Sequence, residues 1–323
     1  FIVSEKYEAV FSISVGVVDA VTFCEGYEEC RKKFAFVLKK AKKMGKNGFY
    51  IFDDNDYESF LRTGKIVAAL RNSVVNGFNG FEVYYQPIVD CSSERVIGAE
   101  ALMRFSMTSE EDTETVSPVD FIPLLEETGL IIPAGRYILD EAAKTCCEMQ
   151  QYIPDFKMNI NVSYVQIMHG NVEHDILDVI KKYVLKPDSI CIEMTESGFM
   201  DMTPAFCKFR KALDENHISF VIDDFGTGYS SLNLLKELPV DIIKIDKSFL
   251  DETESSETSK IIIRKTVELT QELDKTVVCE GVETENQADY LRGIRCDMAQ
   301  GYLYAKPMPM EEFEKLLDKE IYG

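Results

Sequence analysis

The sequence predicts an α/β protein whose main part is a TIM-like (β/α)8 barrel. A small, partial α+β segment and a connecting helix precede the barrel. Eight strand-like segments alternate with helical patterns over about 240 residues, the usual size of such a barrel. The strands are apolar on both faces, as buried parallel strands are. Seven of them end in a carboxylate, an amide or a lysine. A doubly wound open sheet is the alternative, but it places ligands only where the strand order reverses.

Residues 1–55 stand apart from the barrel. They contain an alternating strand at 11–17, a lysine-rich helix at 28–44 and a second short strand at 48–52. Two strands and one helix form a poor independent core, so we expect a missing part on the amino-terminal side. Residues 56–80 are predicted to be a connecting helix, and residues 81–323 the barrel.

The barrel region is divided by its hydrophobic periodicity. The predicted strands are 83–89, 96–105, 157–163, 190–196, 219–224, 241–246, 276–282 and 299–304. The predicted helices are 118–128, 134–152, 172–184, 204–216, 230–237, 257–273, 285–293 and 310–319.

Composition excludes several classes of protein. A formal net charge of -21 argues against binding to a nucleic-acid polymer, which requires a basic face. An acidic protein can still bind a small phosphorylated ligand where metal ions or a local arginine supply positive charge. No apolar run is long enough to span a bilayer, so no membrane contact is expected within this chain. Nine cysteines without a spacing framework indicate reduced thiols and a cytoplasmic location, although a longer protein could be membrane-attached through a preceding region.

The polar residues at the strand ends are the most informative feature. Parallel barrel strands would bring them all to one rim, and a carboxylate buried there must be neutralised by a proton, a cation or a metal ion. Oxygen-rich ligands without histidine suit Mg²⁺ or Mn²⁺. The residues are Glu100, Asn161, Glu193, Asp223, Asp224, Lys244, Glu280 and Gln300.

Asp223 and Asp224 are adjacent, so a straight strand would point them in opposite directions. Gly226 and Gly228 follow, which predicts a bend that lets both carboxylates reach one site, with Asp223 bridging two ions. The alternative is an Asp-rich turn that caps a helix beginning near Ser230.

The three histidines fall in predicted loops or helices and are expected at the surface. Without a histidine as general base, the predicted nucleophile is a water between two metal ions roughly 3.5–4 Å apart.

The chain resembles a known family, the EAL-domain phosphodiesterases, which hydrolyse cyclic diguanylate to the linear dinucleotide pGpG in bacterial signalling. The resemblance covers about residues 81–320 and rests on ordered motifs at matching strand ends. These are Tyr85-Gln86-Pro87, Glu100-Ala101-Leu102-Met103-Arg104, Asn161-Val162-Ser163, Glu193-Met194-Thr195-Glu196-Ser197, Asp223-Asp224-Phe225-Gly226-Thr227-Gly228-Tyr229-Ser230-Ser231, Lys244-Ile245-Asp246, Glu280-Gly281-Val282-Glu283 and Gln300-Gly301-Tyr302.

The resemblance implies a barrel of the EAL type, two divalent cations (Mg²⁺ or Mn²⁺), cyclic diguanylate as substrate and a homodimer formed through the barrel. The implied ligands of the first metal are Glu100, Asn161, Glu193 and Asp223. Those of the second metal are Asp223, Asp224 and Glu280. Catalytic roles are implied for Lys244, which orients or helps activate the attacking water, and for Glu280, Asp224 and Gln300.

The resemblance also implies that Arg104 contacts a substrate phosphate, that Leu102 contacts substrate and that Gln86 lies in the guanine-binding region. Glu196 would steady the loop 225–231. On the residues alone, Arg104 could instead pair with a rim carboxylate, Lys244 could be a barrel-filling ion-pair partner, and Gln86 could be a polar residue at a strand start.

Relatives that have lost metal ligands act as receptors, so a non-catalytic cyclic diguanylate receptor is the alternative function. This chain has all the implied ligands, which favours an enzyme. A scaffold in which the barrel mainly mediates dimerisation is a third interpretation.

Residues 1–52 resemble the C-terminal half of a GGDEF-type cyclase domain. The matching segments are Ser12-Ile13-Ser14-Val15-Gly16-Val17 and Ala41-Lys42-Lys43-Met44-Gly45-Lys46-Asn47. The signature loop of that domain is absent from this sequence, so the chain as given is not expected to synthesise the dinucleotide.

Overall fold

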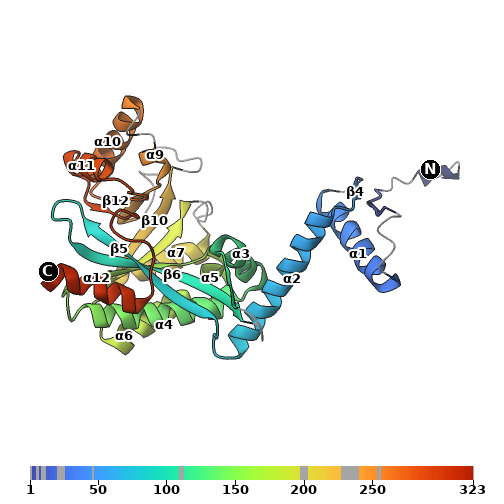
Figure 1. Cartoon of the computed structure of the whole chain (residues 1–323), viewed down its shortest axis with the longest axis horizontal. Helices are drawn as coiled ribbons and strands as arrows, with labels where there is room; N and C mark the ends of the chain where they lie inside the picture. Colours follow the sequence, from blue (N-terminus) through green and yellow to red (C-terminus); the bar gives the residue numbers. More distant parts are fainter. Residues whose placement is uncertain are drawn as a thin grey trace. The chain divides into compact units, whose positions relative to one another are not determined.

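The computed structural model describes residues 2–4, 7–8, 12–19, 26–45, 47–108, 113–196, 203–226, 240–251, 253 and 256–322. The chain divides into two compact units, Phe1–Ala69 and Leu70–Gly323 (Figure 1). The division falls inside helix α2 (Asp54–Val75), which corresponds to the predicted connecting helix. The domain boundaries given above remain a prediction.

The first unit contains two small sheets and a helix. Strands β1 (Ile2–Ser4) and β2 (Tyr7–Glu8) pair antiparallel, and β3 (Val15–Val17) pairs in parallel with β4 (Phe49–Ile51). Helix α1 (Tyr27–Lys43) contributes Phe36, whose ring packs against Tyr50, Phe52 and Tyr57. The predicted helix 28–44 and strand 48–52 are therefore present. Of the predicted strand 11–17, only Val15–Val17 forms a strand among the described residues.

The second unit is built on a closed barrel, as predicted. Eight of the described strands pair in the order β5-β6-β8-β9-β10-β11-β12-β13, and β13 pairs back to β5. This closure rules out the open-sheet alternative. The strands are β5 (Phe81–Asp90), β6 (Val96–Thr108), β8 (Lys157–Asn161), β9 (Ile190–Thr195), β10 (Ser219–Phe225), β11 (Ile242–Ile245), β12 (Thr276–Cys279) and β13 (Met298–Ala299). Strand β7 (Thr113–Val116) extends the sheet outside the barrel by pairing with β6.

Strand β5 departs from the all-parallel arrangement that the sequence analysis expected. It runs antiparallel to both of its neighbours, β6 and β13. The reason is the short β5–β6 connection: Asp90 accepts hydrogen bonds from Ser92 and Ser93 in a tight turn, where a parallel crossover needs a dozen or more residues. Gln86 is consequently paired directly opposite Glu100.

Helices surround the barrel strands (Figure 1). The predicted long helices are confirmed as α3 (Pro118–Thr128), α4 (Ile131–Met149), α6 (Val172–Tyr183), α7 (Pro204–Glu215), α10 (Glu257–Glu272), α11 (Glu285–Gly293) and α12 (Met310–Tyr322). The predicted helix 230–237 lies outside the described residues. Among the described helices, none is long and apolar enough to cross a membrane.

Three short helical elements were not predicted, because they are too short to show a helical period. They are α5 (Tyr164–His169), the 3₁₀ turn η2 (Pro187–Ser189) and α9 (Ser248–Asp251). The prediction of strands over 276–282 and 299–304 was wrong at their carboxyl ends. Both strands stop early, at Cys279 and Ala299, because the chain then turns at Gly281 (φ 68°) and packs Gly301 against the backbone of Val282.

A layer of apolar side chains fills the lower part of the barrel. This layer is a cluster of Ile88, Cys191, Val221, Ile242 and Val278. It is separate from the main core, which packs between the strands and the helices. Four members of this layer stand two residues before a charged residue of the same strand or strand end, and hence share its face. Those charged residues are Glu193, Asp223, Lys244 and Glu280. These four charged residues therefore lie directly next to the buried apolar layer inside the barrel.

Gly98 on β6 allows the close approach of β8 at the level of this apolar layer. A Cβ at residue 98 would lie 2.6 Å from the backbone oxygen of Lys157. We therefore expect Gly98→Ala to lower the free energy of unfolding by about 1–3 kcal/mol through overpacking. Urea denaturation measures the change.

Gly293→Ala is the matched control for that substitution, because a Cβ at the end of α11 meets nothing within 4 Å. Its free energy of unfolding should stay the same or rise slightly. Equal stability of the two variants would contradict the close packing of β6 on β8.

Candidate functional site

The site is organised around the side chain of Lys244 on β11, which is only 1% exposed. Its Nζ lies 2.7 Å from a carboxylate oxygen of Glu280 and 2.9 Å from one of Glu100. The corresponding distances are 3.2 Å to Glu193 and 3.4 Å to Asp223. Four residues from four separate strands or strand ends thus converge on one ammonium group, so Lys244 makes the ion pairs that its alternative role requires.

Amide side chains complete the hydrogen bonding of these carboxylates. Asn161 donates to Glu100 Oε1 at 2.7 Å, and Gln300 donates to Glu100 Oε2 at 2.8 Å. Asn159 donates to Glu193 Oε1 at 2.5 Å. Asn159 is not among the predicted site residues. Its alternation with Asn161 on the same face of the strand was the signal that would have found it.

Burial and charge shift the protonation of the cluster in opposite directions. Burial disfavours the ammonium form of Lys244, but the surrounding carboxylates, Asp223 and Glu100 foremost, outweigh it and hold the pKa of Lys244 well above its usual value. Burial also opposes ionisation of Glu100, yet the charge of Lys244 keeps the pKa of Glu100 below its usual value. Lys244 and Glu100 therefore form a buried ion pair.

The remaining carboxylates are under electrostatic strain. Burial and then the charge of Glu100 raise the pKa of Glu193 well above its usual value. Burial raises the pKa of Glu280 to about 8, even though Lys244 opposes that shift. Burial and the charge of Asp223 also raise the pKa of Asp224. One lysine does not supply enough positive charge for this set of acids.

The described acidic residues form two groups that could hold a metal ion. One group is Glu100, Glu193 and Asp223, and the other is Asp223, Asp224 and Glu280. Within each group the ligand oxygens lie within 4.8 Å of one another, and Asp223 belongs to both. With all five carboxylates ionised, as metal ligands must be, the cluster and its one ammonium would carry four net negative charges, which two divalent cations would balance.

The backbone of β10 explains how two adjacent aspartates reach one site. The pairing of β10 with β11 shifts register between Ile222 and Phe225, as in a β-bulge. Asp224 has φ 56° and Gly226 has φ 104°, both in the left-handed region. The chain therefore bends where the two glycines predicted it to bend. The alternative helix near Ser230 lies outside the described residues.

Gln300 and Gln86 link the cluster to the following loop. Gln300 Nε2 donates to Gln86 Oε1 at 3.0 Å, and Gln86 Nε2 donates to the carbonyl oxygen of Ala305 at 3.2 Å. The Oε1 atom of Gln300 is buried and accepts no hydrogen bond from the described residues. This acceptor fits a water molecule held inside the cluster, so the donor set as a whole suits hydrated, oxygen-liganded cations such as Mg²⁺ or Mn²⁺.

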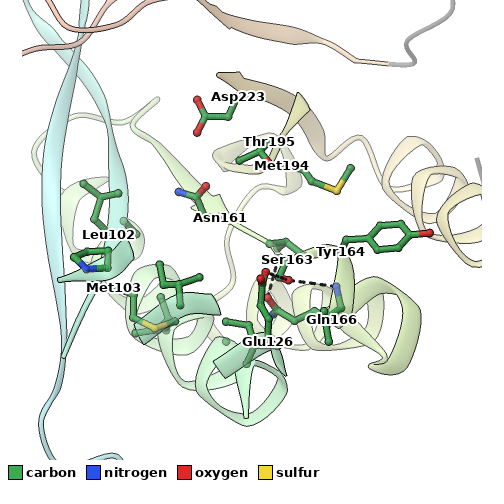
Figure 2. A pocket seen from close by; sticks show the side chains of 18 of the residues that line it. Leu102, Met103, Glu126, Asn161, Ser163, Tyr164, Gln166, Met194, Thr195 and Asp223 are labelled. Carbon is green, nitrogen blue, oxygen red and sulfur yellow. Dashed lines mark hydrogen bonds between the residues drawn. The ribbon is translucent and has the colours of Figure 1, made fainter. Parts of the chain in front are cut away.

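A cavity of about 600 Å³ opens beside the cluster (Figure 2). Its wall includes the metal-group residues Glu100 and Asp223 together with Asn161. Leu102 and Arg104 on β6 also line it. Among the described residues, Arg104 makes no ion pair with a rim carboxylate; it donates to the carbonyl oxygen of Met103. Its guanidinium is thus available to an anionic ligand.

Glu196 lies just after β9 and is 6% exposed. Its Oε2 accepts a hydrogen bond from the backbone N–H of Gly226 at 3.0 Å. Glu196 therefore contacts the loop 225–231 at its second residue, and the rest of that loop lies outside the described residues. The histidines His169, His174 and His217 do not line the cavity.

Comparisons with known proteins place this geometry in a family. A sequence model of the EAL domain matches residues 67–307. The chain is 33% identical over 315 residues to the signaling protein YkoW of Bacillus subtilis, covering 97% of this chain and 38% of that protein. It is 33% identical over 270 residues to the cyclic di-GMP phosphodiesterase PdeL of Escherichia coli, covering 83% of this chain and 72% of PdeL.

Solved structures agree. The phosphodiesterase PaMucR in complex with c-di-GMP aligns with a TM-score of 0.68 and 33% identity, over 77% of this chain and 99% of that one. The EAL enzyme Bd1971, bound to cAMP and cyclic-di-GMP, aligns with a TM-score of 0.74 and 28% identity, over 91% of this chain and 77% of that one. This chain spans less than half the length of YkoW. It also spans only 44% of MucR of Pseudomonas aeruginosa, a bifunctional diguanylate cyclase/cyclic di-GMP phosphodiesterase. The barrel, the convergent carboxylates and these matches together show that the chain belongs to the EAL-domain family.

Proposed function

We propose that this chain is a metal-dependent phosphodiesterase that hydrolyses cyclic diguanylate to linear pGpG in bacterial second-messenger signalling. The observation that carries the proposal is the convergence of four carboxylates on Lys244, with Asp224 as a fifth in the same cluster, beside a cavity. Relatives of similar sequence are named cyclic di-GMP phosphodiesterases, and PaMucR was solved with c-di-GMP bound. A receptor without catalysis would not require so strained a set of acids.

We assign the metal ligands as two sets that share one residue. Glu100, Glu193 and Asp223, together with Asn161, would hold the first cation, and Asp223, Asp224 and Glu280 would hold the second. Asn161 donates its amide to Glu100, which leaves its carbonyl oxygen to face the cation. Two Mg²⁺ or Mn²⁺ ions would lower the pKa of a water molecule and offset the charge of the phosphate.

The other residues hold water and substrate. Lys244 orients the attacking water by donation from Nζ, and the unpartnered Oε1 of Gln300 accepts a hydrogen bond from a water inside the cluster. Arg104 binds a phosphate of the substrate by charge-assisted hydrogen bonds. Leu102 contacts the substrate from the cavity wall. Gln86 keeps one donor and one lone pair for the guanine-binding region while it holds Gln300.

We further propose that the protein is cytoplasmic and that it forms a homodimer through the barrel. Glu196 supports this arrangement by holding the start of the loop 225–231. Analytical ultracentrifugation of the chain tests the dimer. The GGDEF-like character of the segment before the barrel also remains a proposal.

The first prediction concerns the metal dependence of the reaction. Mg²⁺ or Mn²⁺ should support conversion of cyclic diguanylate to pGpG, EDTA should abolish it, and Ca²⁺ should support it poorly because its larger, looser coordination fits a two-metal site less well. Chromatography of the products measures the reaction. Metal-free binding seen by calorimetry, with no linear product under any metal, would support the receptor instead.

The second prediction concerns Asp223, the carboxylate common to both metal groups. Asp223→Asn should lower kcat by more than about 100-fold, since even partners outside the ligand set change activity by 10–100-fold. Asp178→Asn, on the exposed face of α6, is the matched control and should keep full activity.

A thermal melt separates this loss from unfolding. Without metal, Asp223→Asn should melt at or above the wild-type temperature, because the substitution removes one of several crowded negative charges. Mn²⁺ should raise the melting temperature of the wild type more than that of the variant. A variant that melts well below the metal-free wild type would show that Asp223 has a structural role.

A further inference from the structure

The position of Asn161 depends on a short turn between β8 and α5. Asn161 is the last residue of β8, and Ser163 caps the amino terminus of α5. The Ser163 backbone N–H donates to the Gln166 side chain at 2.9 Å, and Ser163 Oγ accepts from the N–H of Val165 at 3.2 Å. This capping box sets where the turn lies, and Asn161 is only two residues away from it.

A residue from a different helix holds this turn. Glu126 on α3 accepts a hydrogen bond from the Ser163 hydroxyl, and Figure 2 shows this contact beside the Ser163–Gln166 bond. The hydroxyl of Ser163 thus donates to one partner and accepts from another. A carboxylate acceptor makes such a bond short and strong.

Helix α4 fixes the same turn from a second side. Gly135 packs so close to the side chain of Gln166 that a Cβ at residue 135 would lie 2.2 Å from its Nε2. Glu126, Gly135, Ser163 and Gln166 also line the cavity that reaches Asn161. The β8–α5 turn is therefore clamped between α3 and α4 at the end of the cavity away from the rim.

We propose that Glu126 is a positioning residue for the first cation, acting through Ser163 on Asn161; this rests on the proposed function. Holding the turn sets the Asn161 amide so that Nδ2 donates to Glu100, which would leave its carbonyl oxygen as a ligand for the cation. Residues that orient metal ligands from outside the ligand set typically change metal affinity or activity by about 10–100-fold.

Mn²⁺ titration of the full chain, followed by the electron paramagnetic resonance signal of free Mn²⁺, tests the proposal. Glu126→Ala should weaken Mn²⁺ binding by about 10–100-fold and lower kcat at subsaturating metal. Glu126→Gln should retain most of the affinity, because its amide oxygen still accepts from Ser163. Glu127→Ala is the matched control, since Glu127 is exposed on the same helix, and its affinity should equal that of the wild type.

Ser163→Ala supplies an independent variant of the same contact. It removes the hydrogen bond to Glu126 and also the cap bond from the Val165 N–H, so it should weaken Mn²⁺ binding at least as much as Glu126→Ala does. The double variant should lose little more than Ser163→Ala alone, because Glu126 acts through the Ser163 hydroxyl. If Glu126→Ala does not fold, judged by circular dichroism, the Ser163→Ala variant decides the proposal.

Three results would overturn the positioning role. Unchanged Mn²⁺ affinity with a lower melting temperature makes Glu126 structural only. Unchanged affinity with a raised KM for cyclic diguanylate makes it a substrate contact from the cavity wall. No Mn²⁺ binding by the wild type removes both this role and the proposed function. If the wild type binds Mn²⁺ but forms no pGpG, the proposed function is contradicted and the positioning role of Glu126 is not. The titration then still measures the effect of Glu126 on metal affinity.

Discussion

The buried ammonium of Lys244 is the interaction on which the candidate site depends. It lies next to a buried apolar layer of the barrel, and it faces more carboxylates than it can neutralise. The Lys244–Glu100 pair is stable as an ion pair, whereas burial presses Glu193, Glu280 and Asp224 toward the protonated form. The imbalance supports the proposal that cations bind at this rim, because added positive charge would relieve the repulsion that the fold maintains.

Much of this arrangement could be predicted from the sequence. A strand that is apolar on both faces must be buried, so a carboxylate at its end needs a proton, a cation or a metal ion beside it. That logic located Glu193, Asp223 and Lys244, whereas Gly226 and Gly228 indicated the bend at Asp224. It failed where local pattern carries no directional information. The reversed direction of β5 follows from a short turn, and α5 is too short to show a period.

Contacts made across the fold were also invisible in the sequence. The hydrogen bond from Asn159 to Glu193 and the one from Ser163 to Glu126 join residues separated by 34 and 37 positions, and nothing in their local pattern pairs them. Strand ends were overextended at Glu280 and Gln300 because their neighbours are apolar enough to continue a strand. Only the close packing of Gly301 on Val282 shows why the strand must stop there.

The closure of the barrel by β5 has a consequence for the order of folding. Because β5 pairs with the last strand, the seam joins the two ends of the barrel sequence, and the Gln86–Gln300 contact spans 214 residues. Such distant contacts are entropically expensive and tend to form late. The Glu100–Gln300 bond spans 200 residues and joins β6 to the residue that follows β13, across the intervening β5. The carboxylates are therefore brought fully together only when β5 pairs with β13. A partly folded chain can form most of its helices and strands before the carboxylates repel one another at full strength.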